Sequence, residues 1–157
     1  LGKYCGLGLT LLVNVSIMLV VYLATLWLNQ APIHLGLLQA VALIYVELLI
    51  VTAVALFFST FSSATLSAIL TLGLYVVGHL TTDLKALAET SPQAAMKTVT
   101  TAIYYLCPNL EALNVKGEAA AGLVLGASYV TPVAAYGLLY AALLVTGACV
   151  VFQRRDF

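Results

Sequence analysis

The stretch that decides the fold is residues 36–58, which read GLLQAVALIYVELLIVTAVALFF and carry one charge, at Glu47. An α-helix rises about 1.5 Å per residue, so about 20 apolar residues cross a hydrocarbon core of about 30 Å. Three further apolar stretches qualify on the same grounds: residues 5–28, 63–80 and 131–152. We therefore predict an all-α, polytopic bundle with four transmembrane helices, forming one domain over residues 1–157.

The composition of the whole chain supports a lipid environment. Of its 157 residues, 63% are hydrophobic and 8% are charged, whereas soluble domains have about 25% charged residues. A soluble fold of this size could not cover so much apolar surface with polar groups. The sequence has no basic run that would bind nucleic acid, and three cysteines are too few for a disulfide-rich secreted fold.

The charges beside the predicted spans give the expected orientation. Lys3 precedes the first span, and Arg154 and Arg155 follow the last one. Four crossings place both ends on one side, which the positive-inside rule makes the cytoplasmic side of the cell membrane. Because the chain opens on Leu1 rather than on Met, we also expect it to be the C-terminal part of a longer protein.

The connecting segment 81–130 is then external, and its pattern is not that of a plain loop. Residues 119–130 are apolar but too few to span, which favours a re-entrant or interfacial piece. We expect the last span to open at Pro132, where a first-turn proline lacks no needed N–H group. We predict one helical face made of Met96, Val99, Ile103 and Leu106. We also expect an outer aromatic belt made of Tyr104, Tyr105, Tyr129 and Tyr136. The segment 81–130 is therefore interpreted either as surface helices that cap the bundle or as a functional gate.

The sequence lacks the usual catalytic and metal-binding patterns. No G-x-x-x-x-G-K-[ST] motif is present, so we expect no P-loop ATP site and no other cofactor in this chain. His34 and His79 are predicted near opposite ends of their spans, on opposite sides of the hairpin, and no cysteine pair has ligand spacing, so we expect no metal site. The chain is therefore not predicted to be an enzyme.

Two polar residues lie inside predicted spans. Glu47 is near the middle of its span, where a carboxylate costs about 2.5–3.5 kcal/mol on insertion scales, so it should face protein or water rather than lipid. It is either a hydrogen-bonded structural residue or a group that lines a transport path. Asn14 in the first span presents the same choice, with the structural role favoured.

The order of motifs along the chain resembles one family. The motifs are AVALFFSTFS at 53–62, GHL at 78–80, DLK at 83–85, YYLCPNLE at 104–111 and FQRRDF at 152–157. In this order and spacing they are similar to the C-terminal part of an ABC-2-type transporter permease, of the kind linked to multicopper-enzyme maturation. The resemblance covers essentially the whole chain.

The resemblance implies six transmembrane helices per permease, of which this chain holds the third to the sixth. It implies pairing with a second permease, in a homo- or heterodimer, and docking of separate ATP-binding subunits that hold the ATP and Mg²⁺. The expected activity is movement of a substrate across the membrane, with export favoured. The candidates for an external gate are Tyr104, Tyr105, Asn109 and Glu111.

Other classes of protein predict different observations. A secondary carrier would need buried ionisable residues for ion coupling, for which Glu47 alone is thin support. A membrane enzyme would need an acid/base or nucleophile set. A structural membrane subunit would show no transport defect when the interiors of its spans are altered.

Overall fold

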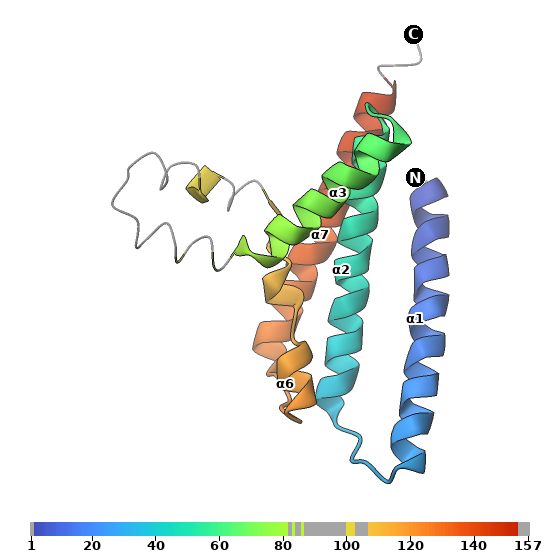
Figure 1. The fold of residues 1–157 in the computed structure, drawn as a ribbon, viewed down its shortest axis with the longest axis vertical. Helices are drawn as coiled ribbons and strands as arrows, with labels where there is room; N and C mark the ends of the chain where they lie inside the picture. Colours follow the sequence, from blue (N-terminus) through green and yellow to red (C-terminus); the bar gives the residue numbers. More distant parts are fainter. Residues whose placement is uncertain (1, 82, 84–85, 87–99, 103–106, 154–157) are drawn as a thin grey trace.

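The computed structural model describes residues 2–81, 83, 86, 100–102 and 107–153, and in this part helices are joined by short turns and irregular segments (Figure 1). No β-strand occurs among these residues, so the predicted all-α class is confirmed there. The elements are α1 (Gly2–Leu28), α2 (Leu35–Ser59), α3 (Ala64–His79), the 3-10 helix η1 (Glu111–Leu113), α6 (Lys116–Ala120) and α7 (Ala127–Gln153).

Three of these helices are long and apolar enough to cross a membrane: α1, α2 and α7. They have 27, 25 and 27 residues, which corresponds to about 38–40 Å each at 1.5 Å per residue. Helix α3 has 16 residues and is therefore only about 24 Å long, less than the hydrocarbon core of about 30 Å. The predicted span 63–80 is thus a helix, but it is too short to count as a fourth crossing by itself.

The path of the chain explains how α3 manages with this length. Helices α2 and α7 run in the same direction, so the chain must return along the bundle between them (Figure 1). Helix α3 covers the first part of this return, and the segment with η1 and α6 covers the rest. Helix α1 begins, and α7 ends, at the same end of the bundle.

The breaks between helices lie where the sequence predicts them. After α1 the chain turns at Gln30, whose φ of 52° is left-handed, and the Ala31 N–H donates to the Leu26 carbonyl at 2.9 Å. Helix α3 starts at Ser63, whose Oγ accepts from the Leu66 N–H at 3.5 Å. The α2–α3 connection is therefore a tight antiparallel turn.

The core lies between α2 and α7. The buried face of α7 is made of small and medium-sized residues: Gly137, Ala141, Val145 and Ala148. A Cβ at Gly137 would lie 2.5 Å from Val46 Cγ1, so the absence of a side chain there allows the two helices to approach closely. Both α1 and the outer faces of α3 and α7 leave large apolar side chains exposed, as a surface in contact with lipid requires.

One expectation about the last helix is wrong. Helix α7 begins at Ala127, five residues before Pro132, so the proline lies inside the helix rather than in its first turn. The helix starts early because the Gly126 carbonyl accepts from the N–H groups of Tyr129 and Val130. Within the apolar run 119–130, α6 ends at Ala120 and the chain turns before α7 begins; a re-entrant or interfacial role for this run stays a prediction.

Candidate functional site: a buried charged cluster

Glu47 is the middle residue of α2 and lies on its buried face. The residue is 4% exposed, between Leu43 and Ile50 on the same side of the helix. The prediction that this carboxylate faces protein rather than lipid is confirmed. A carboxylate buried to this degree needs charged or hydrogen-bonding neighbours.

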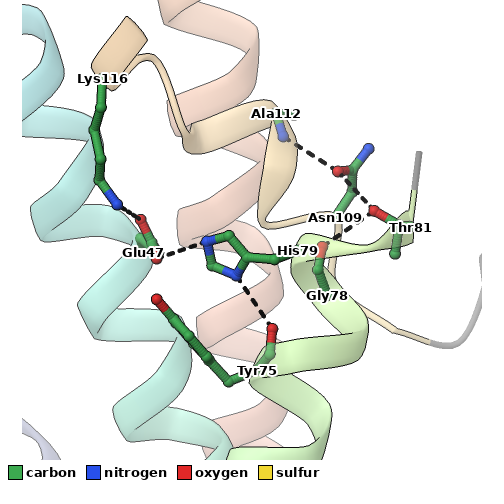
Figure 2. Close-up of polar contacts among 8 residues, drawn as sticks. All are labelled: Glu47, Tyr75, Gly78, His79, Thr81, Asn109, Ala112 and Lys116. Carbon is green, nitrogen blue, oxygen red and sulfur yellow. Dashed lines mark hydrogen bonds and ion pairs between the residues drawn. The ribbon is translucent and has the colours of Figure 1, made fainter. Parts of the chain in front are cut away.

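His79, the last residue of α3, is one of these neighbours. Its Nε2 lies 3.3 Å from Glu47 Oε1, and its Nδ1 lies 3.1 Å from the Tyr75 carbonyl oxygen (Figure 2). The rings of Tyr75 and His79 are 4.4 Å apart, so the histidine ring is held from two sides. Its place in the last turn of α3 also sets it at the negative end of the helix dipole, which favours a positive charge.

The Tyr75 contact assigns one proton of the histidine ring. A carbonyl oxygen only accepts hydrogen bonds, so Nδ1 must carry a hydrogen and donate it. The second ring nitrogen, Nε2, therefore points at Glu47 either as a donor in the imidazolium or as an acceptor in the neutral ring.

Lys116, the first residue of α6, approaches Glu47 from the other side. Its Nζ lies 3.8 Å from Glu47 Oε2, within ion-pair distance but beyond hydrogen-bond length (Figure 2). The lysine side chain is 51% exposed, whereas Glu47 Oε2 is fully buried and has no hydrogen-bond partner among the described residues. The carboxylate thus has one oxygen beside histidine and one oxygen that no donor satisfies.

The end of α3 is tied to the chain that precedes η1. The Gly78 carbonyl accepts from the Leu110 N–H at 3.1 Å. Thr81 Oγ1 lies 3.1 Å from both the Gly78 carbonyl oxygen and Asn109 Oδ1, which share its one hydrogen. Asn109 Oδ1 also accepts from the Ala112 N–H at 3.2 Å (Figure 2). These contacts satisfy backbone groups that the end of a helix leaves open, and they hold His79 at the level of Glu47.

Two tyrosines of α7 join the same segment to the bundle. The Asn109 N–H donates to the Tyr136 hydroxyl at 3.1 Å, and the Tyr129 hydroxyl donates to the Ala112 carbonyl at 3.1 Å. Non-helical backbone inside a membrane protein is stable only where protein or water satisfies it. The side chains of this segment therefore act as supports for the cluster.

The stretch between α6 and α7 is fixed to the start of α2. Gln39 Nε2 donates to the Leu125 carbonyl at 2.9 Å, and its Oε1 accepts from the Leu125 N–H at 3.0 Å. Close by, a Cβ on Gly36 would collide with the Leu123 carbonyl oxygen. Gly122, with a φ of +74°, packs against the His34 ring. This attachment fixes both ends of the segment that carries Lys116.

The predicted site residues are thus distributed over different places. Glu47 belongs to the cluster, and Asn109 supports it, while Glu111 lies partly buried in η1. Asn14 is on the exposed face of α1, away from the cluster. The other residues predicted in the segment 81–130 fall outside the described residues: Tyr104, Tyr105 and the helical face of Met96, Val99, Ile103 and Leu106.

Sequence reasoning missed His79 and Lys116. It placed His79 at the outer end of a full span, but α3 is short and ends beside the middle of α2. Counting residues outward from the α2–α3 turn could have placed His79 near Glu47. Ser67 donates to the Ala55 carbonyl, and these two residues each lie six positions from residue 61. By the same count Glu47 faces Tyr75, and His79 lies one helical turn further along the same face. No such count reaches Lys116.

The side chains of the cluster are of types that can exchange a proton and form ion pairs. Among the described residues no group of three or more His, Cys, Asp or Glu side chains could hold a metal ion. Cys107 lies before the segment that supports the cluster, and burial raises the pKa of its thiol. The three cysteines of the chain are free thiols. The chain matches no protein-family model, no curated protein and no solved structure.

Proposed function

We propose that the chain is the membrane-embedded part of a permease that moves a polar substrate across the cell membrane. The observation that carries the proposal is the buried Glu47 in an apolar helical bundle, with His79 and the half-exposed Lys116 at ion-pair distance from it. Ionisable residues inside membrane segments are costly and rare, and substrate or ion pathways are among the places where they occur.

The interruption of α3 supports the same function. Broken helices near the middle of a membrane protein expose backbone dipoles that transporters use to bind substrates and ions. Here α3 ends beside the middle residue of α2, and the segment with the short helices η1 and α6 continues the return. The ionisable cluster lies at this break, as a transport site of this kind requires.

In its finer form, the proposal is the permease subunit of an ABC-2-type transporter. The motif order along the chain supports it, together with four membrane segments when α3 and the segment after it count as one crossing. Under this proposal a separate ATP-binding subunit supplies the energy, a second permease completes the pathway, and both termini of this chain are cytoplasmic.

A secondary carrier is the second candidate, and one observation favours it. Such a carrier needs more than one buried ionisable group for coupling, and His79, which is 20% exposed, now joins Glu47. In this alternative an ion gradient, rather than ATP, drives transport.

Purification under native conditions distinguishes the two candidates. The chain is isolated from its own membranes and reconstituted in liposomes, and the preparation is assayed for ATP hydrolysis and for a co-purifying polypeptide with a P-loop. We expect an ATPase subunit to co-purify in a stoichiometric amount with the chain. The rate of ATP hydrolysis should change in Glu47→Gln but not in Glu118→Gln, which alters an exposed residue. If no ATPase subunit is present, and a pH gradient across the same liposomes drives proton movement, the chain is a carrier and the ABC proposal is wrong.

A further inference from the structure

The contact between Glu47 and His79 fixes the number of protons that the two side chains share. Because His79 Nδ1 donates to the Tyr75 carbonyl, Nε2 is the only ring nitrogen that faces the carboxylate, at 3.3 Å from Oε1. Without a proton on this line, two lone pairs would face each other. With one proton, the pair is either an imidazolium beside a carboxylate or a neutral ring beside a carboxylic acid.

The second oxygen of the same carboxylate, Oε2, has no hydrogen-bond donor beside it among the described residues. Glu47 Oε2 is fully buried with no hydrogen-bond partner among the described residues, and the nearest cation, Lys116 Nζ, stops at 3.8 Å. A buried carboxylate oxygen without a donor is unfavourable unless the negative charge is cancelled elsewhere. The proton shared with His79 provides this cancellation, so Lys116 does not need to come closer.

We propose that Glu47 and His79 form a proton-binding site that holds one exchangeable proton between Oε1 and Nε2, and that Lys116 is the cation that compensates Glu47 when this proton leaves. The site binds a proton whichever energy source drives transport, so the proposal goes beyond the proposed function and does not depend on it.

The exchange is balanced in atoms and charge. With the proton bound, Glu47 and His79 are together neutral and Lys116 carries one positive charge. When the proton passes to water near the half-exposed lysine, Glu47 is left as a carboxylate and His79 as a neutral ring. The Lys116 ammonium then donates a hydrogen bond to Oε2, and the cluster of three residues becomes neutral.

This exchange links proton occupancy to the position of the chain after α3. Lys116 is the first residue of α6, so its hydrogen bond to Oε2 ties the start of that helix more firmly to α2. Meanwhile the bare Nε2 of His79 no longer holds Oε1, which loosens the last turn of α3. Loss of the proton therefore transfers the attachment of Glu47 from α3 to α6.

The other ionisable groups on the surrounding elements make no ion pair with Glu47 among the described residues. Within the described residues the ion-pair partners of Glu47 are His79 and Lys116, and the Tyr75 ring stacks beside His79. The other titratable side chains on the elements that pack against α2 are Lys3, Tyr4, Cys5 and Tyr22 on α1, Glu111 on η1, Glu118 on α6, and Tyr129, Tyr136, Tyr140 and Cys149 on α7. Since no ion pair links any of these to Glu47, we expect its proton to respond first to Lys116.

The first experiment reads the histidine protonation directly. The chain has two histidines, so ¹⁵N-histidine labelling in lipid nanodiscs gives two sets of ring signals, and His34→Gln assigns them. We expect His79 to show a protonated Nδ1 together with a strong hydrogen bond at Nε2. A His79 ring with a bare Nδ1 and a proton on Nε2 would overturn the proposal.

The second experiment follows release of the proton during a pH titration. Lys116→Gln removes the compensating cation, so the deprotonated carboxylate loses its partner and the site holds its proton more tightly, by about tenfold in proton affinity. Lys3→Gln, the same change at the exposed start of α1, is the matched control and should leave the His79 titration unchanged. Equal titrations in the two lysine variants would refute the role of Lys116.

A third variant separates proton binding from a merely structural role. In Glu47→Gln the amide keeps the shape of the side chain but cannot exchange a proton, so the His79 signals should change less on Lys116→Gln than they do with Glu47 in place. If His79 still responds to Lys116→Gln by the same factor in this background, Glu47 is not the shared partner. Should Glu47→Gln fail to fold, the wild-type signals and the two lysine variants still decide the question.

Discussion

Gly78 sets the distance between the end of α3 and the segment that supports the charged cluster. A Cβ at this position would lie 2.9 Å from the Pro108 carbonyl oxygen and 2.9 Å from Leu110 Cδ1. A methyl group has no room there, and the carbonyl cannot turn aside without moving the backbone. We therefore predict that Gly78→Ala separates α3 from this segment.

The size of the effect follows from two opposing contributions. Overpacking costs about 1–3 kcal/mol, while alanine in place of glycine stabilises a helix by about 1 kcal/mol. Gly73→Ala, in the same helix with open space around it, has the second contribution alone. The free energy of unfolding of Gly78→Ala should thus be lower than that of Gly73→Ala by about 1–3 kcal/mol.

Thermal unfolding in nanodiscs, followed by exposure of thiols, measures this difference. We expect the midpoint of Gly78→Ala to lie several degrees below that of Gly73→Ala, at about 2–4 °C per kcal/mol. Cys107 precedes Pro108 and is partly buried, so in a variant without Cys5 and Cys149 it should also react faster with maleimide below the transition. If the two glycine variants melt together and label equally, the close packing at Gly78 is wrong.

Two further predictions concern the same part of the molecule. Gln39→Leu leaves the N–H and carbonyl of Leu125 without their side-chain partners and should lower stability by about 1–3 kcal/mol in the same melting assay, whereas the exposed Asn29→Leu should have a smaller effect. Because burial raises the pKa of the Cys107 thiol, less of it is thiolate at a given pH. Near neutral pH its rate of maleimide labelling should therefore lie below that of cysteine in solution, and the rate should continue to rise at higher pH. If Cys107 and cysteine in solution show the same dependence of the rate on pH, this thiol is not buried.

The long helices could be predicted from the sequence because apolar runs of sufficient length are a strong signal. The expected spans 5–28 and 36–58 correspond to Gly2–Leu28 and Leu35–Ser59. The run 63–80 was also found as a helix within one residue at each end, but hydropathy alone does not show that 16 residues fall short of a crossing. Where the last helix starts depends on hydrogen bonds to the Gly126 carbonyl, which the position of Pro132 does not reveal.

The candidate site was only partly predictable, for a reason that depends on distance along the chain. Glu47 was identifiable because a lone charge in an apolar run is costly wherever the helix lies. His79 was within reach, since a tight turn between two antiparallel helices fixes which residues lie opposite each other. Lys116 follows a long connection from α3, and the path of such a connection depends on contacts that no local pattern encodes.

The interruption of α3 and the charged cluster are physically one feature. A helix that stops inside an apolar bundle leaves carbonyl groups such as that of Gly78 without partners, and Thr81 and the Leu110 N–H satisfy it. The same polar surroundings lower the cost of placing Glu47 and His79 there, because fixed dipoles replace part of the water that each charge has lost. An uninterrupted α3 would carry its own hydrogen bonds past this level and leave Glu47 against apolar side chains. The break therefore makes a charged site possible at this depth.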